Sequence, residues 1–68
     1  MAKMTLKAAR VNVGLTQKAA AKKFDVSNKT LFNWENGLSF PDASKIPLIC
    51  DAYRVSYDDL IFLPSNPL

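Results

Sequence analysis

Residues 28–36 divide into a polar face and an apolar face when placed on a helix. At about 100° per residue, four side chains share an arc of roughly 140°: Asn28, Lys29, Phe32 and Asn33. The opposite side carries Ser27, Thr30, Leu31 and Trp34. Amide and ammonium groups pair with the edges of nucleic acid bases, and an aromatic ring can lie on a thymine methyl group. We therefore expect the apolar face to pack in the core and the polar face to be presented to a ligand.

The elements that position this face are two short helices joined by a tight turn. Thr16 is expected to cap the first helix, residues 17–24, by accepting a hydrogen bond from a backbone amide of the first turn. Asp25 interrupts the helical pattern, and aspartate tolerates the left-handed region better than most residues. Ser27 is expected to cap the second helix, and Gly37 to end it after residue 36.

At these residues the chain resembles a known family. The pattern G-L-T-Q, a small residue at Ala21, then V-S, T-L, W-E-N-G and a later proline is similar to the helix-turn-helix DNA-binding domain of phage repressors and Cro proteins, the Xre type. The resemblance runs over residues 6–61 and implies an all-α, compact five-helix, lambda-repressor-like fold. The family signature falls on Gln17, Ser27, Trp34, Glu35, Asn36 and Gly37.

The resemblance also assigns roles to individual residues. It implies base contact by Asn28, Lys29, Phe32 and Asn33. The backbone of the DNA would be held by Thr16 and Asn36, while Gln17 steadies the frame. The family further implies an ion pair between Arg10 and Glu35; the alternative is a solvent-exposed arginine. Two positions depart from the family pattern, because Ala20 is commonly leucine and Asp25 is commonly glycine.

The totals favour one small domain and argue against an enzyme. The 68 residues predict a single domain over residues 1–68, with its core at about 5–62. Cys50 is the single cysteine and there is no histidine, so neither a disulfide nor a metal site is expected. No carboxylate pair adjoins a plausible nucleophile. We therefore expect no catalytic residue, cofactor or small-molecule ligand.

The charge is distributed unevenly along the chain. Residues 1–36 carry seven basic and two acidic side chains, a net charge of +5, whereas residues 37–68 carry two basic and four acidic ones, a net charge of −2. The first half therefore suits a polyanion and the second does not. Lysines also solvate helix faces in every class of protein, so charge alone does not distinguish nucleic-acid binding from an ordinary solvated surface.

Three further helices are expected outside the central pair, at residues 6–13, 45–53 and 57–62. Thr5 would cap the first of these and Gly14 would end it. Beginning the second after Ser44 places Pro47 in the first turn, where proline is tolerated. The third is predicted from a capping box formed by Ser56 and Asp59, with Val55 and Leu60 as its hydrophobic staple.

The predicted location is the bacterial cytoplasm or a phage-infected cell. No apolar run approaches the ~20 residues needed to cross a bilayer, so no membrane association is expected. The start of the chain is too polar for a signal peptide. Both a complete Cro-like regulator and an excised domain fit the length.

Two functions compete. The first is a sequence-specific, double-stranded DNA-binding transcriptional regulator that inserts the helix at 28–36 into the major groove and acts as a homodimer on a pseudo-palindromic operator. The second is a protein-interaction module of the antitoxin or antirepressor type, because Phe32, Leu38 and Phe40 are apolar residues near the presented face. The apolar tail at 63–68 either packs on its own core or contributes to the dimer contact.

Overall fold

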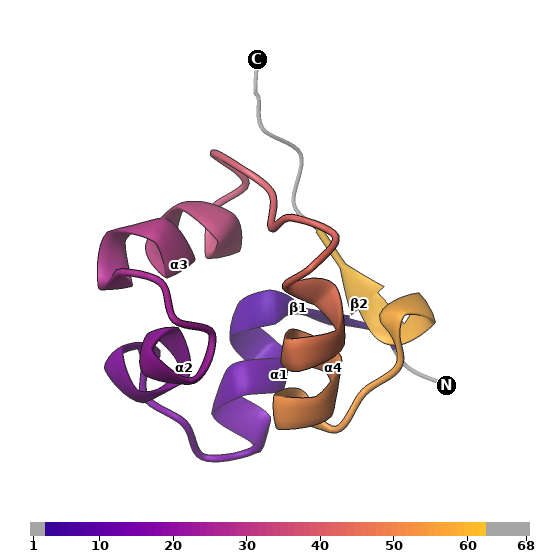
Figure 1. Ribbon diagram of the computed structural model, residues 1–68. Helices are drawn as coiled ribbons and strands as arrows, with labels where there is room; N and C mark the ends of the chain where they lie inside the picture. The colour runs from indigo at the N-terminus through magenta and orange to yellow at the C-terminus, as the bar shows by residue number, and fades with distance from the viewer. Residues whose placement is uncertain (1–2, 63–68) are drawn as a thin grey trace.

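Four α-helices form most of the structure, a computed structural model that describes residues 3–62 (Figure 1). Their bounds are α1 (Leu6–Asn12), α2 (Gln17–Lys23), α3 (Asn28–Glu35) and α4 (Ile46–Tyr53). Two short parallel strands, β1 (Met4–Thr5) and β2 (Leu60–Ile61), pair with Met4 opposite Leu60. The pairing ties the two ends of the described chain together. The predicted tail at 63–68 lies outside the described residues.

The first three helices begin at the predicted caps. The hydroxyl oxygens of Thr5, Thr16 and Ser27 each accept a backbone amide hydrogen bond three residues on, at 3.0 to 3.1 Å. These bonds satisfy donors that have no partner within the helix. The short hydroxyl side chains therefore fix where α1, α2 and α3 begin.

All four helices end in the same closure. In each, the residue directly after the left-handed one donates its amide to a carbonyl five residues back: Leu15 to Arg10, Val26 to Ala21, Leu38 to Asn33 and Val55 to Cys50, at 2.9 to 3.2 Å. Gly14 and Gly37 adopt the positive φ that this closure requires, as predicted. Asp25 and Arg54 adopt it as well, each with φ 58°. The sequence indicated this conformation for Asp25 but not for Arg54.

The predicted fifth helix at 57–62 is wrong. Tyr57–Asp59 forms one 3₁₀ turn, η1, and the chain then extends into β2. The Ser56 hydroxyl donates to the Asp59 carboxylate at 3.0 Å, so it does not cap the backbone. Burial alternates after the turn, with Leu60 buried and Ile61 exposed, which is the two-residue period of a strand. The fold is therefore four α-helices with a 3₁₀ turn and a small parallel sheet.

The start of α4 differs by one residue from the prediction. The helix begins at Ile46, Lys45 occupies the cap position, and no side chain bonds the first amides. Pro47 lies in the first turn, as expected, where its missing N–H has no intrahelical partner to lose.

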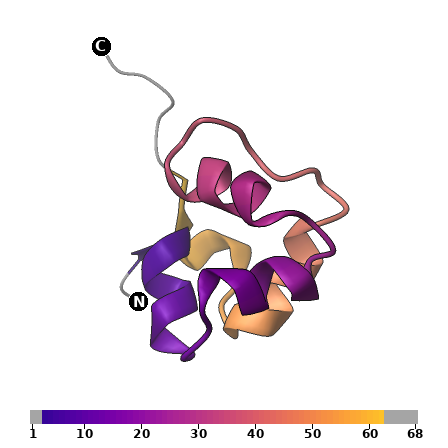
Figure 2. The same cartoon turned by 90° about the vertical axis from the view of Figure 1, so that its left-hand side faces the viewer.

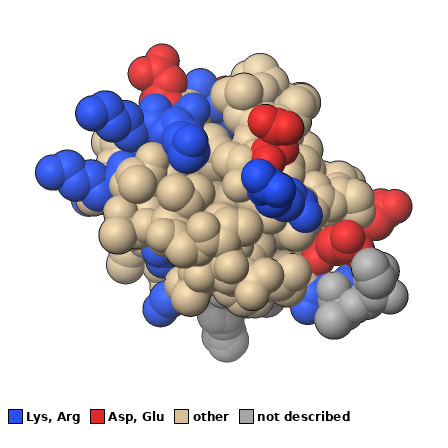
Figure 3. All heavy atoms as spheres, turned by 90° about the horizontal axis from the view of Figure 1, so that it is seen from below, with Lys and Arg blue, Asp and Glu red and all other residues tan. Residues whose placement is uncertain are grey.

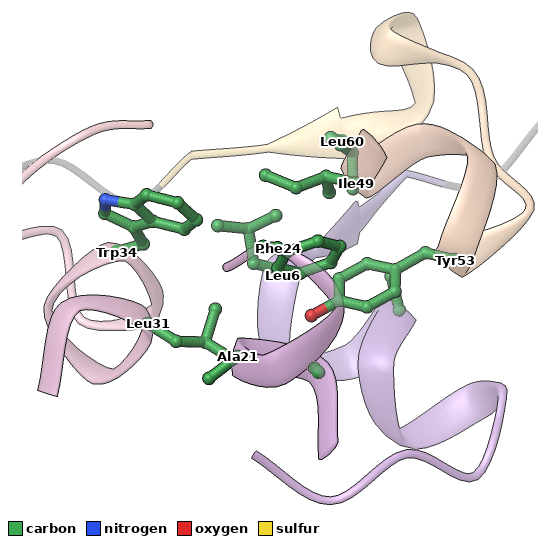
Figure 4. Packing of buried hydrophobic residues seen from close by; sticks show 10 residues of the cluster. Leu6, Ala21, Phe24, Leu31, Trp34, Ile49, Tyr53 and Leu60 are labelled. Atoms are coloured by element: carbon green, nitrogen blue, oxygen red, sulfur yellow. The ribbon is translucent and has the colours of Figure 1, made fainter. Parts of the chain in front are cut away.

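The core draws on every helix and on β2 (Figure 4). Its members are Leu6, Ala9, Ala20, Ala21, Phe24, Leu31, Trp34, Ile49, Tyr53 and Leu60. The two alanines of α2 let the neighbouring helices approach closely, and the ring of Phe24 meets that of Tyr53 edge to face at 5.5 Å. Val13, Ile46 and Cys50 are only half-buried. The core thus fixes α3 through Leu31 and Trp34.

Candidate nucleic-acid interface

The helices α2 and α3 lie on the same side of the molecule, one above the other in the view of Figure 2. The turn between them is short because the amides of Asp25 and Val26 bond back to carbonyls of α2 at 3.2 and 3.0 Å. Ala21, 2% exposed, lies where the two helices approach. The relative position of α2 and α3 is therefore set by a closed turn and a small buried residue.

The helix α3 separates its two faces as its sequence indicated. Leu31 is fully buried and Trp34 is 6% exposed. Asn28 and Lys29 are exposed, and Phe32 keeps 49% of its surface open to solvent. Asn33 is half-buried. Asn28, Lys29 and Phe32 are therefore accessible to a ligand, whereas Asn33 is less accessible on the same face.

A buried polar network joins the end of α3 to α1 and α2. The Arg10 Nε donates to Glu35 Oε2 at 2.7 Å and its second guanidinium nitrogen donates to Oε1 at 3.3 Å. The side-chain amide nitrogen of Gln17 donates to the same Oε1 at 3.1 Å. A third guanidinium nitrogen donates to the carbonyl oxygen of Leu15 at 2.9 Å. One carboxylate therefore links the last residue of α3 to both preceding helices.

The burial of this ion pair changes its expected energy. The side chains of Arg10 and Glu35 are 9% and 2% exposed. A partly exposed pair contributes only ~0–1 kcal/mol, but removing one partner of a buried pair costs several kcal/mol because the other charge is left uncompensated.

The pair also affects Tyr53: burial raises the pKa of its phenol well above the ordinary 10.0, and Glu35 adds to the increase while Arg10 partly offsets it.

The residues expected to contact the DNA backbone or to support that contact have different surroundings. Thr16 is exposed at the start of α2, and its hydroxyl oxygen already accepts the cap bond. Gln17 is half-buried and bonded to Glu35, which fits a supporting role. Asn36 is exposed, and its amide nitrogen donates to the carbonyl of Phe32 at 2.8 Å. An amide nitrogen carries two hydrogens, so one remains for another acceptor.

Basic side chains that the sequence did not single out flank this face. Lys18 and Lys22 line a hollow between α2 and the start of α3, beside Ser27 and Asn28. Seen from below, basic side chains crowd the left-hand edge of the molecule, whereas most acidic ones lie toward the right (Figure 3). This left-hand edge is the side on which Figure 1 shows α2 and α3. The +5 charge of residues 1–36 was the available signal for these lysines.

Two further features are absent from the part of the chain that the structure describes. Within residues 3–62, no three His, Cys, Asp or Glu side chains are grouped to hold a metal ion. In the same range, no helix combines the length and apolar character needed to cross a membrane.

Two comparisons with known proteins bear on this arrangement. The model of the family described as helix-turn-helix matches residues 6–60. A curated protein of Bacillus subtilis (strain 168), the HTH-type transcriptional regulator ImmR, is 39% identical over 56 residues. That alignment covers 82% of this chain and 44% of the relative, so the chain spans less than half the length of the relative it matches.

Proposed function

The chain belongs to the helix-turn-helix family, and we propose that it is a sequence-specific, double-stranded DNA-binding transcriptional regulator of the phage or prophage repressor type. The observation that carries the proposal is the presented face of α3, where Asn28, Lys29 and Phe32 are exposed on a helix held by a buried core and ion pair. In this proposal α3 enters the major groove and the start of α2 meets the backbone. The name of the relative supports regulation of transcription.

Each polar side chain on this face has a suitable base partner. Asparagine pairs with adenine through two hydrogen bonds, lysine donates to guanine, and the ring of Phe32 suits a thymine methyl group. Lys18 and Lys22 would add contacts to phosphate, which raise affinity without reading sequence. Asn33 would read a base at the edge of the contact.

Binding to sites selected from random DNA tests the proposal. Asn28→Ala and Lys29→Ala should each weaken specific binding by about 1–3 kcal/mol per lost contact, roughly 5- to 150-fold in Kd. Binding to random DNA should change little, and the unfolding midpoint should stay that of the parent. Asn12→Ala is a matched control, because Asn12 is an exposed asparagine of α1. Equal losses on selected and random DNA would contradict base reading by α3.

A homodimer on a pseudo-palindromic operator is part of the proposal. One copy offers four candidate base-reading side chains, which discriminate poorly among sites, and two copies double that number. A two-fold dimer would place half-sites about one helical turn apart. Titration onto an intact operator and onto an isolated half-site, with sedimentation to count bound chains, checks this. One chain bound to each site with equal affinity would exclude the dimer.

A protein-interaction module is the second candidate, favoured by the exposure of apolar side chains. Phe32, Leu38 and Phe40 keep 49%, 63% and 57% of their surface exposed. The dependence of DNA affinity on salt separates the two functions, because neutralising phosphates releases counterions and makes log Kd change linearly with log salt. A steep slope on selected DNA supports the regulator, whereas weak binding without a site preference supports the interaction module.

A further inference from the structure

An apolar groove lies between the loop that follows α3, the start of α4 and the end of the described chain. Its walls come from three segments: Phe40, Pro41 and Ala43 of the loop after α3, Ile46 and Pro47 of α4, and Tyr57 and Phe62 at the end of the described chain. We call it the aromatic groove. None of its lining residues is charged, and its volume of about 710 Å³ is within the usual range of ligand sites.

The aromatic rings of this groove are organised but uncovered. The ring centroids of Phe40 and Phe62 are 6.3 Å apart, and those of Tyr57 and Phe62 are 5.8 Å apart. Phe40 and Tyr57 nevertheless remain 57% and 58% exposed. Phe62 also packs against the core, so one wall of the groove is fixed to the interior of the domain. Exposed apolar surface of this kind often marks a contact with another segment or protein.

We propose that the groove is the docking site of the chain's own segment 63–68, LPSNPL. The segment begins next to Phe62, itself a wall of the groove, so no linker separates the site from its occupant. Tethering of this kind gives a high effective concentration for an intramolecular contact. A second copy of the chain would have to compete with it.

The composition of the segment matches the chemistry of the groove. It contains two leucines, two prolines, a serine and an asparagine, with no charged side chain. Proline fixes φ near −65° and biases the preceding residue toward extended backbone. Extended proline-containing peptides bind aromatic-lined grooves because they lose little conformational entropy on binding. Leu63, Pro64 and Pro67 are therefore suited to lie against Phe40 and Tyr57.

The docked segment would brace the loop that follows α3. Phe40 belongs to this loop, and the loop is fastened to α3 by the hydrogen bond from the Leu38 amide to the Asn33 carbonyl at 2.9 Å. Covering Phe40 would restrain the loop at a second point. The segment 63–68 would in this way stabilise the chain immediately beyond the C-terminal end of α3.

Nuclear Overhauser measurements on the 68-residue chain test the proposal. In uniformly labelled protein we expect contacts from the side chains of Leu63 and Pro64 to the rings of Phe40 and Tyr57. In an equal mixture of labelled and unlabelled chains, an experiment that detects only contacts between a labelled and an unlabelled chain should show none between the segment and the groove. The amides of residues 38–40 and 42 should exchange several-fold faster in the double variant Leu63→Ser, Leu68→Ser than in the parent.

A pair of loop variants provides the matched control. Phe40→Ala should abolish the contacts of the segment with Tyr57, whereas Leu38→Ala should keep them, because Leu38 is an exposed apolar residue of the same loop that does not line the groove. Contacts found only between different chains would overturn the proposal and assign the groove to a second copy. Absence of any contact between the segment and the groove would also overturn it.

Discussion

Removing the carboxylate of Glu35 should destabilise the protein more than removing any exposed charged group. Glu35 accepts three hydrogen bonds, at 2.7 and 3.3 Å from Arg10 and at 3.1 Å from Gln17, and its side chain is 2% exposed. In Glu35→Ala the guanidinium of Arg10 would keep only the carbonyl of Leu15 as a partner. Breaking a buried pair in this manner costs about 3–5 kcal/mol.

That loss is large for so small a domain. Proteins in general are stable by only about 5–15 kcal/mol, and short chains lie toward the low end because they bury a smaller fraction of their surface. Urea unfolding followed by circular dichroism measures the difference between parent and variant. Asp51→Ala is the matched control, because Asp51 is an exposed carboxylate of α4, and its change should stay within about 0.5 kcal/mol. A Glu35→Ala variant within ~1 kcal/mol of the parent would refute the reasoning, since that is the range of an exposed pair.

Three further changes probe the core and the backbone. Trp34→Ala should lower the free energy of unfolding by about 3–5 kcal/mol, since the ring is 6% exposed, and a variant with the melting temperature of the parent would contradict this. The hydroxyl of Tyr53 is buried without a hydrogen-bond partner among residues 3–62, so Tyr53→Phe should be neutral or stabilising by up to ~1 kcal/mol at neutral pH in urea unfolding. Because the folded protein raises the pKa of Tyr53, the parent should lose stability as pH rises above about 10, the pKa of an ordinary tyrosine, and Tyr53→Phe should lose less. Arg54→Gly should raise the unfolding free energy by about 0.5–1 kcal/mol by relieving the positive φ, and equal stability of Arg54→Gly and Arg54→Ala would argue against strain there.

The local rules of helix initiation and termination explain why much of the fold was predictable. Thr5, Thr16 and Ser27 cap helices through bonds that span three residues, and such short-range bonds depend little on the rest of the chain. A glycine in the sequence likewise indicates directly where the backbone can adopt the left-handed conformation that ends a helix. The closure at Arg54 has no such mark, because there the packing of Tyr53 and Val55 on the core imposes a conformation that arginine does not favour.

The end of the chain shows the limit of those rules. Ser56 and Asp59 have the spacing of a capping box, yet their side chains bond each other and the helix stops after one turn. What decides the outcome is the pairing of Leu60 with Met4, a contact between residues at opposite ends of the sequence. Local spacing contains no information about such a partner.

The candidate site divides in a similar way. The periodicity of residues 28–36 was sufficient to separate the exposed Asn28 and Lys29 from the buried Trp34. The resemblance supplied the expectation of a pair between Arg10 and Glu35, but not its burial, which depends on how three helices meet. The lysines beside the hollow at the start of α3 also required the fold, because Lys18 and Lys22 approach Asn28 only through the turn.

A double variant of the buried pair tests whether the pair contributes to function mainly by orienting α3 or mainly by stabilising the fold. Replacing both partners with apolar residues, in Arg10→Met with Glu35→Leu, leaves no uncompensated charge and is often neutral or stabilising in other proteins. Glu35 is the last residue of α3, and its bonds to Arg10 and Gln17 set the position of that end relative to α1 and α2. We therefore expect the double variant to recover most of the stability that Glu35→Ala loses, yet to discriminate selected from random DNA less well than the parent. Under the proposed function, a displaced α3 reads bases poorly while phosphate contacts by lysines persist. Unchanged discrimination in a stable double variant would show that the core alone orients α3.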